Sequence, residues 1–218
     1  MGYYLTTLSE DATRALGRRL GTMLKGGAVI LLDGDLGAGK TRFAQGVAKG
    51  LGVTGLVTSP TFNLVLEYPL IDSADSIDLT DSADPVDPAD PADPVDSADS
   101  ADSAGSKDDL NTPRSIVGAH GEARVLRHFD LYRLEQAEQL DDLDYFGSLE
   151  EQDAISLVEW GSKFATALPL EYLLVRIQVL EDLPDKRRFE LSAQGTQASE
   201  LLEQFARAEG MEKGKVES

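Results

Sequence analysis

A glycine-rich segment followed by lysine and threonine carries the residue types in this sequence that could bind and activate a phosphate. Residues 34–41 fit the phosphate-binding loop pattern G-x-x-x-x-G-K-[ST]. The members of this loop are Gly34, Asp35, Leu36, Gly37, Ala38, Gly39, Lys40 and Thr41. Glycines allow the backbone to turn its N–H groups toward phosphate oxygens. Lys40 would place a positive charge near the β- and γ-phosphates, and the Thr41 hydroxyl could ligate Mg²⁺.

The segments on either side of this loop fit the motif. Residues 28–32 (AVILL) form a continuous apolar run, as expected of a buried parallel strand. After the loop, apolar residues recur at helical spacing, at Phe43, Val47, Ala48 and Leu51. The loop is therefore expected to join a strand to a helix, whose N-terminus directs its positive dipole end at an anion. This context favours a phosphate site over a glycine-rich turn that only resembles one.

A proline-containing segment, residues 59–62 (SPTF), carries two hydroxyl groups just after a predicted strand at 56–58. In α/β sheets, ligands bind at the carboxyl ends of the strands, so such positions are candidates for function. Pro60 stiffens the turn, and Thr61 could sense the γ-phosphate or Mg²⁺ as a switch segment does. The alternative is an ordinary polar turn.

Two acidic residues are also placed at strand ends. Asp130 lies within residues 128–134 (HFDLYRL), where a carboxylate could hold Mg²⁺ or its water. His128, two residues earlier, lies on the same face of that strand. Glu159 follows the apolar strand 155–158, which is the Walker B pattern; a carboxylate there completes a magnesium site or orients the attacking water. Trp160, the only tryptophan, belongs to the core or packs beside the nucleotide.

The remaining elements position these residues. Strands are expected at 3–7, 63–68, 124–129, 172–179 and 187–192, the last two antiparallel, and helices at 10–24, 136–143 and 197–208. Ser9 is a candidate N-cap, and the charged tail after Gly210 is expected to fray. Strands that alternate with helices around a phosphate loop predict an α/β fold, a three-layer sandwich like that of P-loop NTPases with a mixed, mainly parallel sheet.

Composition restricts the class of protein. The 218 residues suffice for one α/β domain with a sizeable core. The absence of cysteine excludes disulfides and cysteine-based zinc sites. No apolar run approaches the roughly 20 residues of a membrane span, and the N-terminus lacks the basic and apolar regions of a signal peptide. We therefore expect a cytoplasmic protein with no membrane partner.

An aspartate at every third position, from Asp72 to Asp102, marks an acidic insert. Thirteen Asp and one Lys between Leu70 and Asn111 contribute −12 to the net charge of −19, which leaves −7 for the rest. High like charge without aromatic residues predicts a disordered, solvated loop; a weak calcium site would need glycine turns and long-armed carboxylates. We expect a single domain over 1–209, interrupted by the insert at 70–121, with a charged tail over 210–218.

The four motifs, residues 34–41, 59–62, 128–134 and 158–160 (VEW), together closely resemble the TsaE family. These are the bacterial P-loop ATPases of tRNA threonylcarbamoyladenosine biosynthesis. Order and spacing match from about Leu5 to Leu191 apart from the insert. The resemblance implies slow hydrolysis of ATP with Mg²⁺ and action with the TsaB–TsaD complex, which modifies tRNAs that read ANN codons. It implies contact with tRNA only through that complex, and no transfer of the threonylcarbamoyl group by this chain.

The resemblance also implies a role for each motif residue. Lys40, Asp130 and Glu159 would be the catalytic group, with Thr41 and Glu159 as Mg²⁺ ligands. Asp130 would lie close to the metal and the γ-phosphate, either as an outer-shell ligand of the metal or positioning water. Thr61 would belong to a switch-like loop, Trp160 would lie next to the nucleotide, and Glu10 and Arg188 would approach the base. Two features depart from the family: the insert, and Arg42 where a second threonine is frequent.

Two other function classes remain open at this point. A small-molecule kinase would need an arginine-rich lid and an acceptor pocket. No clustered arginines follow the phosphate loop, and the one long connection is acidic. A non-hydrolysing module could use bound ATP only to order a docking surface. Asp130 and Glu159 argue against that module, because binding alone does not require two carboxylates near the γ-phosphate.

Overall fold

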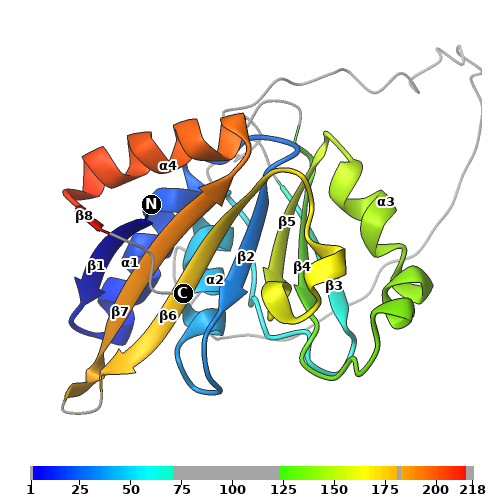
Figure 1. Ribbon diagram of the computed structural model, residues 1–218, viewed down its shortest axis with the longest axis horizontal. Coiled ribbons are helices and arrows are strands. Elements are labelled where there is room, and N and C mark those ends of the chain that lie inside the picture. Colours follow the sequence, from blue (N-terminus) through cyan, green and yellow to red (C-terminus); the bar gives the residue numbers. More distant parts are fainter. Residues whose placement is uncertain (1, 71–122, 181–182, 215–218) are drawn as a thin grey trace, which may run out of the picture.

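The computed structural model describes residues 2–70, 123–180 and 183–214. Within these residues one eight-stranded sheet has the order β3-β4-β5-β2-β6-β7-β1-β8 (Figure 1). The strands are β1 (Gly2–Thr7), β2 (Val29–Asp33), β3 (Val65–Pro69), β4 (Val125–Asp130), β5 (Ala154–Glu159), β6 (Tyr172–Leu180), β7 (Leu183–Gln194) and β8 (Glu212–Gly214). The prediction of a disordered loop, and the calcium site that was its less favoured alternative, fall on the insert, which lies outside the described residues except for Leu70.

The four central strands, β4, β5, β2 and β6, are parallel to one another. The sheet is antiparallel at both edges, where β3 joins β4, β7 joins β6, and β1 and β8 follow. The mixed sheet with a parallel centre confirms the predicted fold class. The predicted antiparallel pairing of the two late strands is also confirmed.

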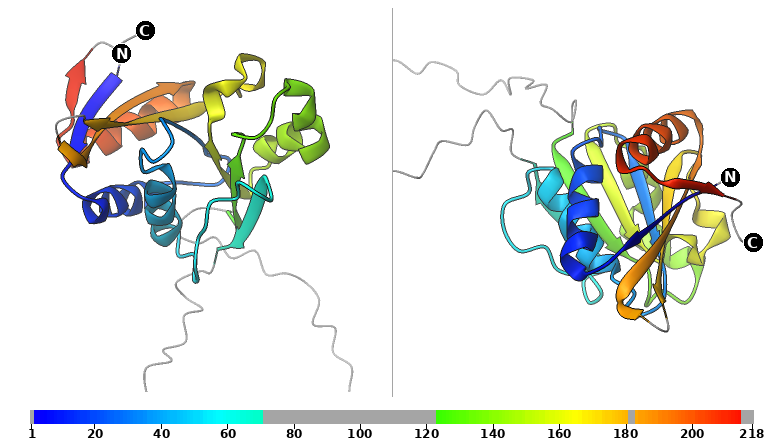
Figure 2. Two further views of the ribbon diagram at one scale, coloured as in Figure 1. Left: turned by 90° about the horizontal axis from the view of Figure 1, so that it is seen from below. Right: turned by 90° about the vertical axis from the view of Figure 1, so that its left-hand side faces the viewer.

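Helices cover both faces of the sheet (Figure 2). The α-helices are α1 (Glu10–Gly21), α2 (Lys40–Gly50), α3 (Tyr145–Glu150) and α4 (Thr196–Glu209), and the 3₁₀ turns are η1 (Ala137–Leu143), η2 (Gly161–Lys163) and η3 (Ala165–Ala167). Alternate residues of β2 enter two separate cores: Ile30 and Leu32 pack with α1 and α2, whereas Leu31 packs with η1 and α3. Burial on both faces explains why β2 reads as a continuous apolar run.

The first helix fixes the position of the phosphate-loop helix. The Ala12 N–H donates to the Ser9 side-chain oxygen at 3.1 Å, which confirms the predicted N-cap. Helix α1 ends at Gly21, earlier than the predicted 24, and packs closely on α2. A Cβ at Gly17 would lie 2.4 Å from the Phe43 carbonyl oxygen, so only glycine permits this approach.

Two local predictions are wrong, and one helix was missed. Residues 56–58 form no strand; the Gln45 side chain donates to the Val57 carbonyl at 2.8 Å in place of a strand partner. The tail is ordered over β8, which pairs with β1 rather than fraying. Helix α3 was not predicted.

Among the described residues no helix is long and apolar enough to cross a membrane.

Candidate nucleotide-binding site

The phosphate loop leaves the carboxyl end of β2 and enters α2, as the motif predicts. Gly37 and Gly39 have φ values of 79° and 107°, in the left-handed region that favours glycine. Gly39 is the N-cap of α2 and supplies no side-chain cap. The first N–H groups of α2 therefore have no intrahelical acceptor and no capping side chain, and they can bind an anion.

Lys40 lies at the floor of this loop with only 5% of its surface exposed. Its Nζ donates to the Gly34 carbonyl at 2.7 Å and to the Asp35 carbonyl at 3.0 Å, and lies 4.2 Å from the centroid of the Trp160 ring. Burial lowers the pKa of Lys40 below the usual range for lysine, although the charge of Glu159 opposes the shift. Both hydrogen bonds of this buried ammonium go to neutral backbone carbonyls. A bound phosphate would therefore supply the negative charge that these partners do not.

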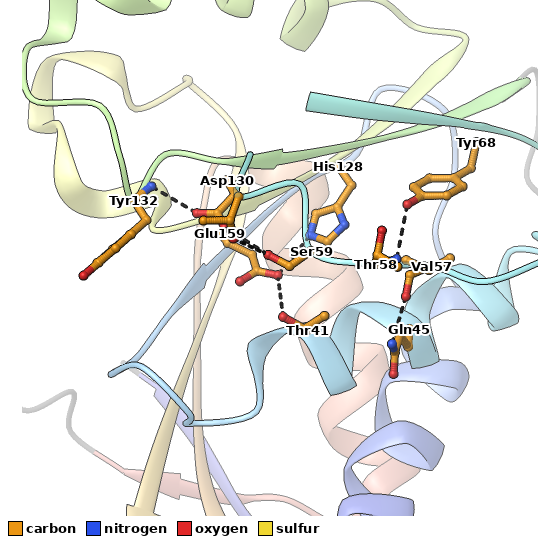
Figure 3. Close-up of polar contacts among 11 residues, drawn as sticks. Thr41, Gln45, Val57, Thr58, Ser59, Tyr68, His128, Asp130, Tyr132 and Glu159 are labelled. Carbon is orange, nitrogen blue, oxygen red and sulfur yellow. Dashed lines mark hydrogen bonds and ion pairs between the residues drawn. The ribbon is translucent and has the colours of Figure 1, made fainter. Parts of the chain in front are cut away.

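Glu159 is the acidic centre of the site (Figure 3). It is 3% exposed, and its Oε1 accepts a hydrogen bond from the Thr41 hydroxyl at 3.2 Å. The Nε2 of His128 lies 3.1 Å from the same oxygen and donates to it, because an ionised carboxylate only accepts. His128 is buried, and its Nδ1 has no hydrogen-bond partner among the described residues. The predicted pairing of this histidine with an acid is real, but the direct partner is Glu159.

Asp130 lies opposite Glu159 in the register of the parallel strands β4 and β5. One of its oxygens accepts from the hydroxyls of Thr61 at 2.5 Å and Ser59 at 3.1 Å, which are themselves 2.6 Å apart. Its other oxygen accepts from the Tyr132 N–H at 3.0 Å (Figure 3). The structure thus brings the SPTF segment onto the second strand-end carboxylate.

These groups surround a cavity of about 280 Å³. The predicted site residues that line it are Glu10, Leu36, Gly37, Gly39, Lys40, Thr41, Thr61, Asp130, Glu159 and Trp160. Gly34, Asp35 and Ala38 belong to the loop without lining this cavity. Six further lining residues were not among the predicted site residues: Thr13, Arg42, Ser59, Tyr132, Asp185 and Arg187.

Arg188 does not join the others. It lies on the opposite face of β7 from Arg187, and its guanidinium carbon is 5.2 Å from the centroid of the Tyr4 ring. The alternation along β7 is the sequence signal that separates the two arginines. Arg187 shares a face with Phe189, whose ring lies 5.4 Å from that of Phe43 on the phosphate-loop helix.

The residues fit a magnesium ion bound together with phosphate rather than a site made by protein alone. Among the described residues no group of three His, Cys, Asp or Glu side chains is placed to hold a metal. Mg²⁺ keeps several waters and commonly binds one or two carboxylates plus substrate phosphates. Thr41 and Glu159, already in contact, supply the oxygens that such an ion requires.

Known proteins resemble this chain over the residues that form the site. The family model described as "Threonylcarbamoyl adenosine biosynthesis protein TsaE" matches residues 7–81 and 104–189. This chain belongs to the TsaE family. The match includes all four motifs that line or support the cavity.

Individual TsaE relatives are similar over most of their length. The TsaE protein of Bacillus subtilis is 29% identical over 202 residues, which is 92% of each chain. That of Streptomyces coelicolor is 30% identical over 177 residues, covering 80% of this chain and 85% of the relative. The crystal structure of Bacillus subtilis YdiB superposes with a TM-score of 0.58 at 25% identity, covering 96% and 97% of the two chains.

Proposed function

We propose that this protein is a Mg²⁺-dependent ATP hydrolase that serves the threonylcarbamoyladenosine modification of tRNA, acting with the TsaB–TsaD complex in the cytoplasm. The observation that carries the proposal is the contact between the Thr41 hydroxyl and Glu159 beside Lys40, in one cavity with Asp130. The TsaE family supplies the pathway, and the geometry supports the chemistry. tRNA would be reached only through the complex.

Each side chain has a role in this proposal. Lys40 and the first N–H groups of α2 bind the phosphates. Thr41 and Glu159 hold Mg²⁺, which neutralises charge that develops on the phosphates. Asp130, fixed by the two hydroxyls and the Tyr132 N–H, orients the attacking water or a water of the metal. Trp160, whose ring lies beside the Lys40 ammonium, would flank the phosphates, and Glu10, which also lines the cavity, would approach the base.

The buried carboxylates favour hydrolysis over mere binding. Asp130 and Glu159 are both 3% exposed, and burying a charged group is costly unless hydrogen bonds or a cation compensate. A protein that only bound ATP would gain nothing from a second carboxylate at this place, since two acids repel a polyphosphate. A non-hydrolysing module is therefore the weaker proposal. A small-molecule kinase is also the weaker proposal, because no clustered arginines follow the phosphate loop and the one long connection is acidic.

The test is Mg²⁺-dependent ATP hydrolysis by the full chain, alone and with TsaB and TsaD added. We expect slow turnover alone, stimulation by the two partners, and no turnover with EDTA. Lys40→Ala protein, assayed in parallel, measures contaminating ATPase. Binding of ATP without hydrolysis under either condition would support the binding module instead.

A further inference from the structure

Arg187 of β7, which lies opposite Val179 of β6, contacts the phosphate loop directly. Its Nε donates to the Ala38 carbonyl at 2.8 Å, and its Nη1 donates to the carbonyls of Lys186 at 3.0 Å and Pro184. A Cβ built at Gly39 would meet the Nε at 3.7 Å. The guanidinium is therefore held against the loop by backbone oxygens, and it lines the cavity.

Arg187 has no acidic partner in the part of the chain that the structure describes. Among the described residues it forms no ion pair, whereas Arg42 at the same cavity pairs with Glu10 at 3.2 Å. A guanidinium has five N–H donors in a planar fork, and the hydrogen bonds of Arg187 use Nε and Nη1. Nη2 remains for a ligand oxygen, and phosphate is the anion that this fork fits.

The sheet order indicates which phosphates Arg187 can reach. β7 lies beyond β6 on one side of β2, while β5 and β4, which carry Glu159 and Asp130, lie on the other side. Arg187 therefore approaches the loop from the side opposite to the two carboxylates. In the proposed function those carboxylates mark the Mg²⁺ and γ-phosphate end of the cavity.

We infer that Arg187 is a nucleotide-binding residue that donates to α- or β-phosphate oxygens while its Nε fixes the phosphate loop at Ala38. This inference rests on the proposed function, because it needs a nucleotide in the cavity. The family resemblance implied an approach to the base by the neighbouring Arg188, whereas this inference places Arg187 at the phosphates.

The test compares Arg187→Ala with Arg188→Ala in the full chain, by calorimetric titration with Mg²⁺-ADP and with Mg²⁺-ATP. Both variants lose one positive charge from adjacent positions of the same strand. We expect Arg187→Ala to weaken ADP and ATP by the same factor, about 10- to 100-fold, as for loss of a charge-assisted hydrogen bond. Arg188→Ala should change both affinities by less than about 2-fold.

Two more variants separate binding from support of the loop. Arg187→Lys keeps the charge, and Arg187→Gln keeps donor groups without charge. We expect lysine, but not glutamine, to recover part of the nucleotide affinity. The melting temperatures of the nucleotide-free proteins should be unchanged. Recovery by glutamine alone, or a large fall in melting temperature in all three variants, would overturn the inference, because Arg187 would then only brace the loop.

The remaining outcomes are also decisive. Wild-type affinity in Arg187→Ala would overturn this inference and leave the proposed function intact. A loss in Arg188→Ala with none in Arg187→Ala would overturn the inference and make Arg188 the nucleotide-binding arginine. Failure of the wild-type chain to bind either nucleotide would overturn both proposals.

Discussion

A single oxygen of Glu159 faces both Thr41 and His128, so three residues from α2, β4 and β5 meet at one atom. Hydrogen-bond donors can stabilise a buried carboxylate until a metal ion binds. Binding of Mg²⁺ would require Thr41 to turn its hydroxyl hydrogen away from Glu159, since the hydroxyl oxygen becomes a ligand. His128 has no such conflict and can keep Glu159 in place in both states.

Lys40→Ala is expected to abolish nucleotide binding. The change removes the buried ammonium that the loop carbonyls orient. Loss of two or more charge-assisted hydrogen bonds corresponds to a fall in affinity of about 100-fold or more. Lys49→Ala, at the exposed end of the same helix, is the matched control and should bind normally. Calorimetry with ADP would measure both, and unchanged affinity in Lys40→Ala would contradict the phosphate-site assignment.

Glu159→Gln is expected to retain ATP binding and lose hydrolysis by about 100-fold or more, a size typical of lost acid–base or electrostatic assistance. Glutamine keeps the shape and can still accept from Thr41, but it loses the charge that attracts Mg²⁺. Glu190→Gln is the control, because Glu190 is also buried yet pairs with Arg176 away from the cavity. Turnover at the wild-type rate would show that Glu159 is only a residue at the end of a strand.

At the scale of elements, the SPTF segment connects the phosphate-loop helix to the strand-end acids. The Asn63 and Leu64 N–H groups donate to the Pro60 carbonyl at 2.9 and 2.7 Å, which closes the turn. The Asp130 N–H then donates to the Leu64 carbonyl at 2.9 Å. Since the segment carries no strand of its own before β3, these contacts and the two hydroxyls fix it relative to Asp130.

Thr61→Val is expected to slow ATP hydrolysis by about 10-fold while leaving ADP affinity within about 2-fold. Valine has nearly the same shape but cannot donate to Asp130, and one hydrogen bond to a charged group accounts for a change of this size. ADP lacks the γ-phosphate that this end of the cavity would address. Thr58→Val removes an exposed hydroxyl from the residue just before the SPTF segment and should have no effect on steady-state turnover. Equal slowing by both variants would assign the effect to the segment rather than to the hydroxyl.

Elements whose own residues decide their conformation were predictable from sequence. The apolar run of β2 and the mostly apolar β5 are buried on both faces, and α1 carries its own cap in Ser9. Helix α3 has only six residues, and its formation depends on Tyr145, whose ring packs edge-on against Phe129 of the distant β4. β8 is three residues long and exists because the edge of β1 is available to pair. Such tertiary partners are not visible in a local pattern.

The candidate site likewise has parts that were predictable from the sequence and parts that were not. The strand-end acids and the phosphate loop were predictable because motif spacing and sheet topology fix their positions. The contact of His128 with Glu159 depends on the register between β4 and β5, which the sequence does not state. The choice between Arg187 and Arg188 likewise depends on which face of β7 packs on α2.

At the scale of the whole molecule, the connection that contains the acidic insert begins and ends at neighbouring points of the sheet. The Leu70 N–H donates to the Arg124 carbonyl at 2.9 Å, and Pro69 lies opposite Val125 in the antiparallel ladder of β3 and β4. A short turn could therefore join the two strands. The path of the chain through the fold does not require a connection of this length.

Deleting residues 72–102 is accordingly expected to leave ATP affinity unchanged and stability within about 1 kcal/mol of the full chain. Each halving of a flexible connection changes closure entropy by only about 0.6 kcal/mol, in favour of the shorter loop. For a protein of this size, 1 kcal/mol corresponds to a shift in melting temperature of about 2–4 °C.

Replacing the aspartates of this segment with asparagine, at full length, separates charge from length in assays with TsaB and TsaD. A fall in melting temperature of 10 °C on deletion would instead mean that the insert packs on the domain. If the deletion and the asparagine replacement both increased the stimulation of ATP hydrolysis by TsaB and TsaD, the charge of the insert would be what hinders these partners.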